Sequence, residues 1–291
     1  MVDPITSLTP PRFDLAEGAV WDDQTNTLLF CDILGHAIWA FDWETQALRS
    51  WVFEKTVGSF GLCKDGGLIV AHHDEILLFD KETGAREVLV QIEANDDRTR
   101  LNDGKVGPDG AFWVGTMDDR SPRKPIAALY RVAPEGTVRK IAEEIHVSNG
   151  LAWSPDGSQM FHSDSSTGRV DRYDFDPTTG ALSNRTQYLQ LDNTLGRPDG
   201  GTIDADGNYW SAGVSAGNVN CFSPGGNLIM SIGMPAPRPT MPCFAGPDLD
   251  HLVVTTLKPH SDPELMTKYP LSGSVFVMTP GAKGVPSHRF G

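Results

Sequence analysis

A short unit recurs along this chain of 291 residues: one residue before a glycine, an apolar run, a turn at an Asp, and a second apolar run. The turns lie at Asp22, Asp65, Asp109, Asp156, Asp206 and Asp248. They are separated by 43, 44, 47, 50 and 42 residues. Short apolar runs between Gly and Asp turn signals indicate β-strands, and a repeat of this length made of strands is typical of propeller blades with four strands each. The unit therefore predicts an all-β fold, a six-bladed β-propeller.

The repeat runs from one end of the chain to the other, so we expect a single propeller domain over residues 1–291. In the first blade, residues 27–33, 36–43 and 47–53 are the expected second, third and fourth strands. Residues 5–13 are expected to add an outer strand to the last blade and so close the ring. No segment keeps an apolar 3.6-residue period over three turns, so helices should be scarce.

Composition excludes several classes of partner. The net charge of −14 and the pI near 4.9 argue against nucleic acid and against an anionic membrane surface. There is no apolar run of 18 residues and no recognisable secretory signal, so neither a transmembrane helix nor export is expected. Four cysteines without a C-x-x-C pair are expected to be buried free thiols in a cytoplasmic protein, a monomer or weak homo-oligomer.

The first strand of each propeller blade lines the central channel, so residues at the start of these strands meet at one mouth. The repeat assigns to this mouth Glu17, Phe60, Asn102 with Asp103, Asn149, Asp199 and the segment 242–243. Crowded carboxylates repel one another unless a cation is present. Two carboxylates and one amide oxygen, from Glu17, Asn149 and Asp199, suit Ca²⁺, Mg²⁺ or Mn²⁺, with Zn²⁺ also possible. Asx side chains also cap ordinary turns, but their recurrence at matched positions favours one shared divalent cation.

A group of cations stands out from the acidic background. It consists of Arg98, Arg100, Arg120, Arg123 and Lys124. One interpretation is a solvated loop balanced by neighbouring aspartates. The other is a set of cations that binds an oxyanion or an acidic substituent of a substrate.

Five motifs together resemble the SMP-30/gluconolactonase/regucalcin-like family over essentially the whole chain. They are Glu17-Gly18 with Trp21, residues 100–105 (RLNDGK), Gly115-Thr116-Met117, Ser148-Asn149-Gly150 with Trp153, and Pro198-Asp199-Gly200. The resemblance implies a six-bladed propeller that holds one divalent metal through Glu17, Asn149 and Asp199. It also implies that Arg100 and Asn102 bind the substrate, and that the activity is hydrolysis of sugar lactones such as gluconolactone to aldonic acids.

One position departs from the family pattern. Regucalcin-type members tend to have an acidic substrate-binding residue shortly after the G-T-M motif, and direct alignment puts Arg120 there. We therefore predict that Arg120 binds substrate and that the lactone can bear an acidic substituent.

These observations lead to a metal-dependent lactonase hypothesis. Asp199 is the candidate general base, Arg100 and Asn102 orient the substrate, and Asp103 contacts a substrate hydroxyl or a metal-bound water. Two alternatives remain open: a non-catalytic propeller that binds calcium or a ligand, and another metal-dependent esterase, for example one acting on organophosphates or aryl esters.

Overall fold

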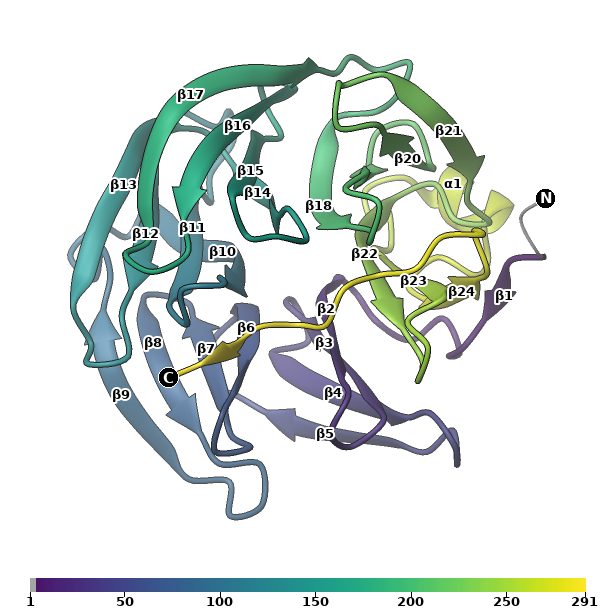
Figure 1. Cartoon of the computed structure of the whole chain (residues 1–291). Coiled ribbons are helices and arrows are strands. Elements are labelled where there is room, and N and C mark those ends of the chain that lie inside the picture. Colours follow the sequence, from purple (N-terminus) through teal and green to yellow (C-terminus); the bar gives the residue numbers. More distant parts are fainter. Residues whose placement is uncertain (1–3) are drawn as a thin grey trace.

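The structure is a computed structural model that describes residues 4–291. Six sheets are arranged around a central channel, each with the four antiparallel strands of one blade (Figure 1). The predicted six-bladed β-propeller is confirmed. The innermost strands, from the first blade to the sixth, are β2 (Ala16–Asp22), β6 (Val57–Cys63), β10 (Thr99–Val106), β14 (Ser148–Trp153), β18 (Pro198–Ile203) and β22 (Pro239–Ala245).

The other strands follow in order from the channel outward. The second strands are β3 (Thr27–Asp32), β7 (Leu68–His72), β11 (Phe112–Asp118), β15 (Gln159–Asp164), β19 (Tyr209–Gly213) and β23 (His251–Thr256). The third strands are β4 (Ala37–Asp42), β8 (Glu75–Phe79), β12 (Ala127–Val132), β16 (Arg169–Asp176), β20 (Asn218–Phe222) and β24 (Phe276–Met278). The outermost strands are β5 (Leu48–Val52), β9 (Arg86–Gln91), β13 (Val138–Ile145), β17 (Ala181–Gln190), β21 (Leu228–Gly233) and β1 (Thr6–Ser7).

The hydrophobic core lies between the blades. Each of six clusters of buried apolar side chains joins two neighbouring sheets, and large aromatic residues such as Trp113, Phe161 and Trp210 are buried in them. Strands of the inner layers are almost wholly buried because both of their faces pack on adjacent blades, whereas β5, β9 and β17 are largely exposed. The four cysteines are buried free thiols, as expected from their spacing.

Both ends of the described chain complete the ring. Strand β1 pairs antiparallel with β24, which confirms that a segment within residues 5–13 closes the last blade. The C-terminal segment was not expected from the repeat: it crosses the channel and adds β25 (Arg289–Phe290), which pairs parallel to β6 (Figure 1). The N–H of Gly291 also donates to the Gly110 carbonyl of the third blade, so the tail links several blades.

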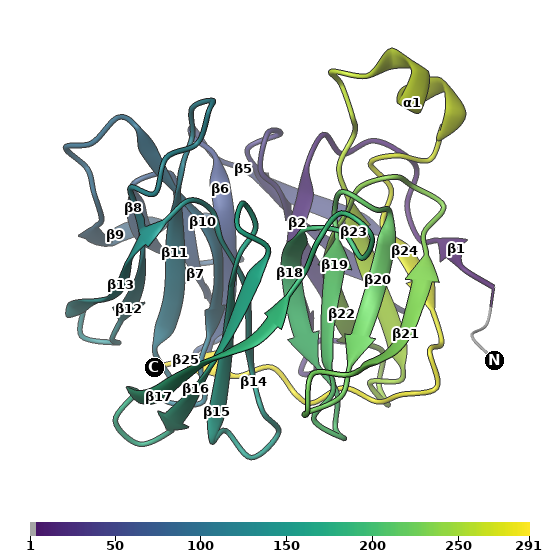
Figure 2. The same cartoon turned by 90° about the horizontal axis from the view of Figure 1, so that it is seen from above.

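One short helix, α1 (Pro263–Lys268), interrupts the last blade between β23 and β24. Its N-cap is Asp262, whose carboxylate accepts a hydrogen bond from the Leu265 N–H at 3.0 Å. Figure 2 shows that α1 projects from one end of the propeller, while the C-terminal tail crosses the other end. In residues 4–291, no helix has the length and apolar character needed to cross a membrane.

Candidate active site at the channel mouth

One backbone hydrogen bond recurs at the start of all six blades and defines which residues are equivalent. In the first blade the Ile33 N–H donates to the Leu15 carbonyl at 2.9 Å. The corresponding carbonyls in the other blades belong to Thr56, Arg98, Val147, Arg197 and Arg238. Two residues after each of these positions stand Glu17, Gly58, Arg100, Asn149, Asp199 and Thr240. Glu17, Asn149 and Asp199 are therefore equivalent positions, as the repeat predicted.

Two of the predicted mouth positions are wrong. Phe60 is fully buried and lines a lower part of the channel, as do Pro242 and Cys243. The mouth positions of the second and sixth blades are instead Gly58 and Thr240. The repeat is misleading here because its glycines are not structurally equivalent. Gly18 has a φ of +57°, whereas Gly61 has ordinary φ and allows close packing against Val106.

Every innermost strand contains a one-residue β-bulge. In some blades the bulge includes the mouth position, and in the others it follows that position. The register of β2 with β3 shifts between Glu17 and Val20, and the same shift recurs in the other five blades. Bulges redirect side chains and are common near active sites. In the third blade the shift lies between Leu101 and Gly104, where it turns both Asn102 and Asp103 toward the mouth.

The mouth contains a cavity of about 250 Å³. Six of the residues predicted from the sequence line it: Glu17, Arg100, Asn102, Asp103, Asn149 and Asp199. Arg120 does not line it, because this side chain is exposed and its Nε pairs with the Asp118 carboxylate at 3.3 Å. Arg123, from the same loop, lines the cavity instead.

Arg100, Asn102 and Asn149 form a connected group. The Arg100 guanidinium donates to Asn102 Oδ1 at 3.0 Å, and its Nε pairs with Asp119 at 3.0 Å. Asn102 Nδ2 donates to the Ser148 carbonyl at 3.0 Å and to Asn149 Oδ1 at 3.4 Å. The Asn149 amide nitrogen in turn donates to Ser165 Oγ at 2.8 Å. These donors identify the side-chain oxygen of each amide: Asn102 Oδ1 faces the Arg100 guanidinium, and Asn149 Oδ1 faces Asn102 Nδ2.

The three carboxylates of the cavity are buried close together. Burial raises the pKa of Glu17 well above its ordinary value, and the charges of Asp199 and Asp103 raise it further. Burial, together with the charge of Asp103, raises the pKa of Asp199 to about 8. Burial also raises the pKa of Asp103, against the opposing charge of Lys105. Without a cation beside them, the three carboxyl groups do not all ionise readily, because their negative charges repel one another.

The residues present fit a divalent cation. Glu17 and Asp199 supply carboxylate oxygens, Asn149 supplies an amide oxygen, and hard oxygen ligands of this kind suit Ca²⁺ and Mg²⁺. In addition, Asp103 Oδ1 is buried without any hydrogen-bond partner. An orphaned buried oxygen of this kind indicates a missing donor or cation. Among residues 4–291 there is no metal-binding group of three His, Cys, Asp or Glu side chains, and the predicted ligand set includes only two such residues.

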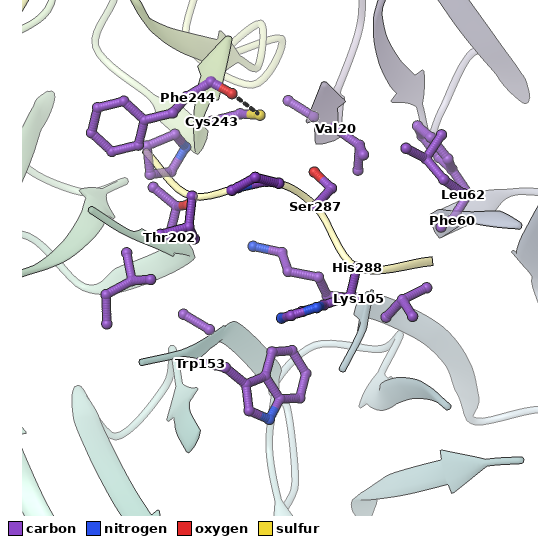
Figure 3. A pocket seen from close by; sticks show the side chains of 18 residues that line it. Val20, Phe60, Leu62, Lys105, Trp153, Thr202, Cys243, Phe244, Ser287 and His288 are labelled. Atoms are coloured by element: carbon purple, nitrogen blue, oxygen red, sulfur yellow. Dashed lines mark hydrogen bonds between the residues drawn. The ribbon is translucent and has the colours of Figure 1, made fainter. Parts of the chain in front are cut away.

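Lys105 lies on the channel side of this cluster. Its Nζ donates to the Gly201 carbonyl at 2.8 Å, and burial lowers its pKa. Lys105 also lines a separate cavity farther along the channel, together with several apolar side chains and the tail residues Ser287 and His288 (Figure 3). The tail therefore closes the channel at the far end, so the mouth is the open side of the site.

The structure also contains a pair that sequence reasoning did not find. Ser148 Oγ and His162 Nε2 lie 2.8 Å apart, across β14 and β15. His162 makes no such bond with the next residue, Ser163, whose Oγ is buried without a hydrogen-bond partner, because neighbouring side chains on one strand point to opposite faces. Ser148 is fully buried and does not line the cavity. Ser148 directly precedes Asn149, so the hydrogen bond between Ser148 and His162 holds the backbone next to this candidate metal ligand.

The chain is similar to known proteins over most of its length. The model of the family described as the SMP-30/gluconolactonase/LRE-like region matches residues 15–258. Regucalcin of Danio rerio is 34% identical over 281 residues, which cover 95% of each chain. Regucalcin of Homo sapiens is 30% identical over 292 residues, 98% of each chain.

Solved structures agree with this assignment. The structure of a calcium-binding protein, regucalcin, from Agrobacterium tumefaciens superposes with a TM-score of 0.93 at 27% identity, over 99% of this chain and 98% of that one. A luciferin-regenerating enzyme superposes with a TM-score of 0.88 at 28% identity, over 99% of each chain. A gluconolactonase from Xanthomonas campestris, 21% identical over 94% of this chain and 89% of that one, shares the fold with a TM-score of 0.76. The chain belongs to the SMP-30/gluconolactonase/LRE-like family.

Proposed function

We propose that this protein is a lactonase that hydrolyses a sugar lactone to the corresponding aldonic acid with the help of one divalent cation. The lactone is gluconolactone-like, including forms with an acidic substituent. The observation that carries the proposal is the convergence of Glu17, Asn149 and Asp199, from equivalent positions of three blades, on a cavity that Arg100 and Asn102 also line. Membership of a family named for gluconolactonase supports the same reaction.

The roles of the side chains follow from their placement. A bound divalent cation supplies Lewis-acid polarisation of the lactone carbonyl. Asp199 accepts a proton from the attacking water on a carboxylate oxygen as the water oxygen bonds to the carbonyl carbon. The ring C–O bond then breaks, and the proton passes to the leaving ring oxygen. The direction of the Asp199 pKa shift requires a neighbouring positive charge to keep this base ionised at neutral pH.

Arg100 and Asn102 orient the substrate. Their side chains are buried and held by hydrogen bonds to each other, to Asp119 and to the Ser148 carbonyl, so little ordering is needed when substrate binds. Asp103 is the candidate acceptor for a sugar hydroxyl, since its Oδ1 has no partner of its own.

The test is hydrolysis of a panel of sugar lactones, followed by proton release, before and after removal of metal with EDTA. We expect EDTA to abolish hydrolysis and re-addition of Ca²⁺, Mg²⁺, Mn²⁺ or Zn²⁺ to restore it. The variant Asn149→Leu, which removes one candidate ligand but no charge, should require more cation for half-maximal activity. Full activity after exhaustive EDTA treatment would remove the cation from the mechanism.

A second candidate function is calcium binding without catalysis. It is favoured by the similarity to the Agrobacterium tumefaciens regucalcin, which is described as a calcium-binding protein. Calorimetric Ca²⁺ binding with no turnover of any lactone would support this candidate. Turnover of aryl esters or organophosphates but not lactones would support the third possibility, a different metal-dependent esterase.

The buried free thiols of Cys31, Cys63, Cys221 and Cys243 support a reducing compartment, and we propose a cytoplasmic location.

A further inference from the structure

Three arginines line the mouth cavity without a carboxylate partner. They are Arg123, Arg197 and Arg238. Within residues 4–291 none of the three forms an ion pair, whereas Arg100 in the same cavity pairs with Asp119. The Nε of Arg238 is buried and has no hydrogen-bond partner at all. A buried guanidinium N–H without an acceptor is costly in a folded protein, so an acceptor is expected to come from a ligand.

Two of these arginines occupy equivalent positions in neighbouring blades. The Arg197 carbonyl accepts from the Val214 N–H at 3.1 Å, and the Arg238 carbonyl accepts from the Leu257 N–H at 3.0 Å. The same position is apolar in the first and fourth blades, at Leu15 and Val147, both of which line the cavity. In the third blade this position is Arg98, which forms an ion pair with Asp96, so the unpaired arginines at this position are those of the fifth and sixth blades.

The cavity continues on this side. A second cavity, of about 440 Å³, shares Arg197, Val214 and Arg238 with the first and extends to Leu265 and Tyr269 of the α1 segment. Arg197 and Arg238 thus stand where the two spaces meet, beyond the candidate metal ligands. A substituent that extends from a lactone ring toward α1 would pass between them.

The charge balance of the mouth points the same way. The carboxylates of Glu17, Asp103 and Asp199, with Asp119 at the rim, are matched by Arg100, Lys105 and one divalent cation. The three unpaired arginines are then in excess, although the chain as a whole carries a net charge of −14. A locally positive cavity in an acidic protein selects an anionic ligand.

We propose that Arg123, Arg197 and Arg238 form an anion subsite that binds a carboxylate or phosphate at the end of the lactone remote from its reacting carbonyl. This inference rests on the proposed lactonase function and deepens it by assigning the residues that select the substrate. Guanidinium groups bind carboxylate and phosphate oxygens through paired N–H donors, so either group suits the subsite chemically.

The experiment measures kcat/KM in Ca²⁺-containing buffer for glucono-1,5-lactone, its 6-phosphate and the 1,5-lactone of glucaric acid, which has a carboxylate at carbon 6. We expect at least one charged lactone to be preferred over the neutral one by about 10-fold or more. The variants Arg197→Gln and Arg238→Gln should each reduce kcat/KM for that charged lactone by about 10-fold, mainly through KM, and change the neutral lactone by less than about 3-fold. The charged lactone with the higher kcat/KM shows whether the subsite prefers a carboxylate or a phosphate.

Two controls separate a subsite from general charge or misfolding. Arg49→Gln removes one positive charge from the exposed strand β5, away from the mouth, and should leave the preference between lactones unchanged. Arg238→Lys keeps the charge but loses the paired donors, and should retain part of the preference. Equal kcat/KM for charged and neutral lactones in the unmodified protein would overturn the proposal, as would a preference that survives Arg123→Gln, Arg197→Gln and Arg238→Gln combined in one variant.

Binding tests the subsite independently of turnover. Calorimetric titration with gluconate, glucarate and 6-phosphogluconate compares ligands that differ only at carbon 6. If no lactone is hydrolysed but glucarate or 6-phosphogluconate binds at least about 10-fold tighter than gluconate, the lactonase proposal fails while the anion subsite stands. If hydrolysis occurs but the three ligands bind equally, the subsite proposal fails while the lactonase stands.

Discussion

Asn102 Nδ2 lies 3.4 Å from Asn149 Oδ1, so a candidate substrate-binding residue of the third blade contacts a candidate metal ligand of the fourth blade. The same nitrogen donates to the Ser148 carbonyl at 3.0 Å. One side chain therefore aligns the oxygen of Asn149 while its own Oδ1 accepts from Arg100. We therefore expect binding at the proposed substrate site and binding at the proposed cation site to be coupled through this contact.

Replacing Asn102 should therefore weaken cation binding as well as catalysis. In Asn102→Ala the Asn149 oxygen loses its neighbour, and we expect Ca²⁺ affinity to fall by about 3- to 10-fold, the usual effect of one neutral hydrogen bond. Calorimetric titration with Ca²⁺ measures the affinity of the parent and of the variant. The matched control is Asn220→Ala, which removes another buried amide that bonds the Leu195 carbonyl away from the mouth. Unchanged Ca²⁺ affinity in Asn102→Ala would show that the contact has no role in binding.

Asp199→Asn should separate cation binding from proton transfer. The amide keeps one oxygen for the cation but cannot accept the proton of water, so kcat should fall by about 10²- to 10⁴-fold. Bound metal is measured by elemental analysis and kcat by proton release. A variant that holds metal and keeps the parent kcat would assign the general base to another group.

Gly150→Ala should disturb the bulge that carries Asn149. Gly150 has a φ of +66°, and a Cβ there would lie 2.5 Å from the Tyr209 hydroxyl and 2.6 Å from Ser163 Oγ. Backbone strain plus this overlap should lower the free energy of unfolding by about 2–4 kcal/mol in urea denaturation. Gly84→Ala is the control, because its φ is +75° but a Cβ there meets no atom within 4 Å. It should cost only about 1–2 kcal/mol, and an equal loss in both variants would rule out the overlap.

His162 should make stability depend on pH in the acid range. Burial lowers the pKa of His162 to about 4, below the value near 6.5 expected in the unfolded chain. Its contribution to stability is complete above about pH 6.5 and is lost as pH falls toward 4, because the unfolded chain then binds the proton more readily. The expected loss is up to about 3 kcal/mol, with about 1.36 kcal/mol per pKa unit.

Comparison of urea denaturation at about pH 7 and about pH 4.5 in the parent and in His162→Gln measures this contribution. The variant should lack this part of the pH dependence, whereas His260→Gln, at an exposed position, should retain it. The prediction is wrong if the parent and His162→Gln lose the same free energy between the two pH values.

Much of the fold could be predicted because each blade is encoded locally. Alternating apolar runs and Asp turns specify strands and hairpins over a few residues, so the six units and the closing strand within residues 5–13 could be found from the chain alone. Glu17, Asn149 and Asp199 could be aligned because the two flanking signals, a following Gly and an Asp turn, have similar spacing in their blades. Phe60 and the segment 242–243 were misaligned because the bulge position shifts relative to those signals.

The composition of the site depended on contacts between blades, which no local pattern reports. Arg120 and Arg123 belong to one loop, yet only Arg123 lines the cavity, because Asp118 holds Arg120 at the surface. Arg197 and Arg238 were not singled out, since their equivalence rests on hydrogen bonds to strands many residues later.

The sequence by itself determined the six-bladed propeller and three oxygen-bearing side chains at matched positions, because strand periodicity and turn chemistry act over short stretches of chain. Only the tertiary structure decided which charges remain unpaired at the mouth and how the C-terminal tail closes the far end of the channel. Those features arise when ring closure brings distant segments together, and burial there decides which groups keep a partner.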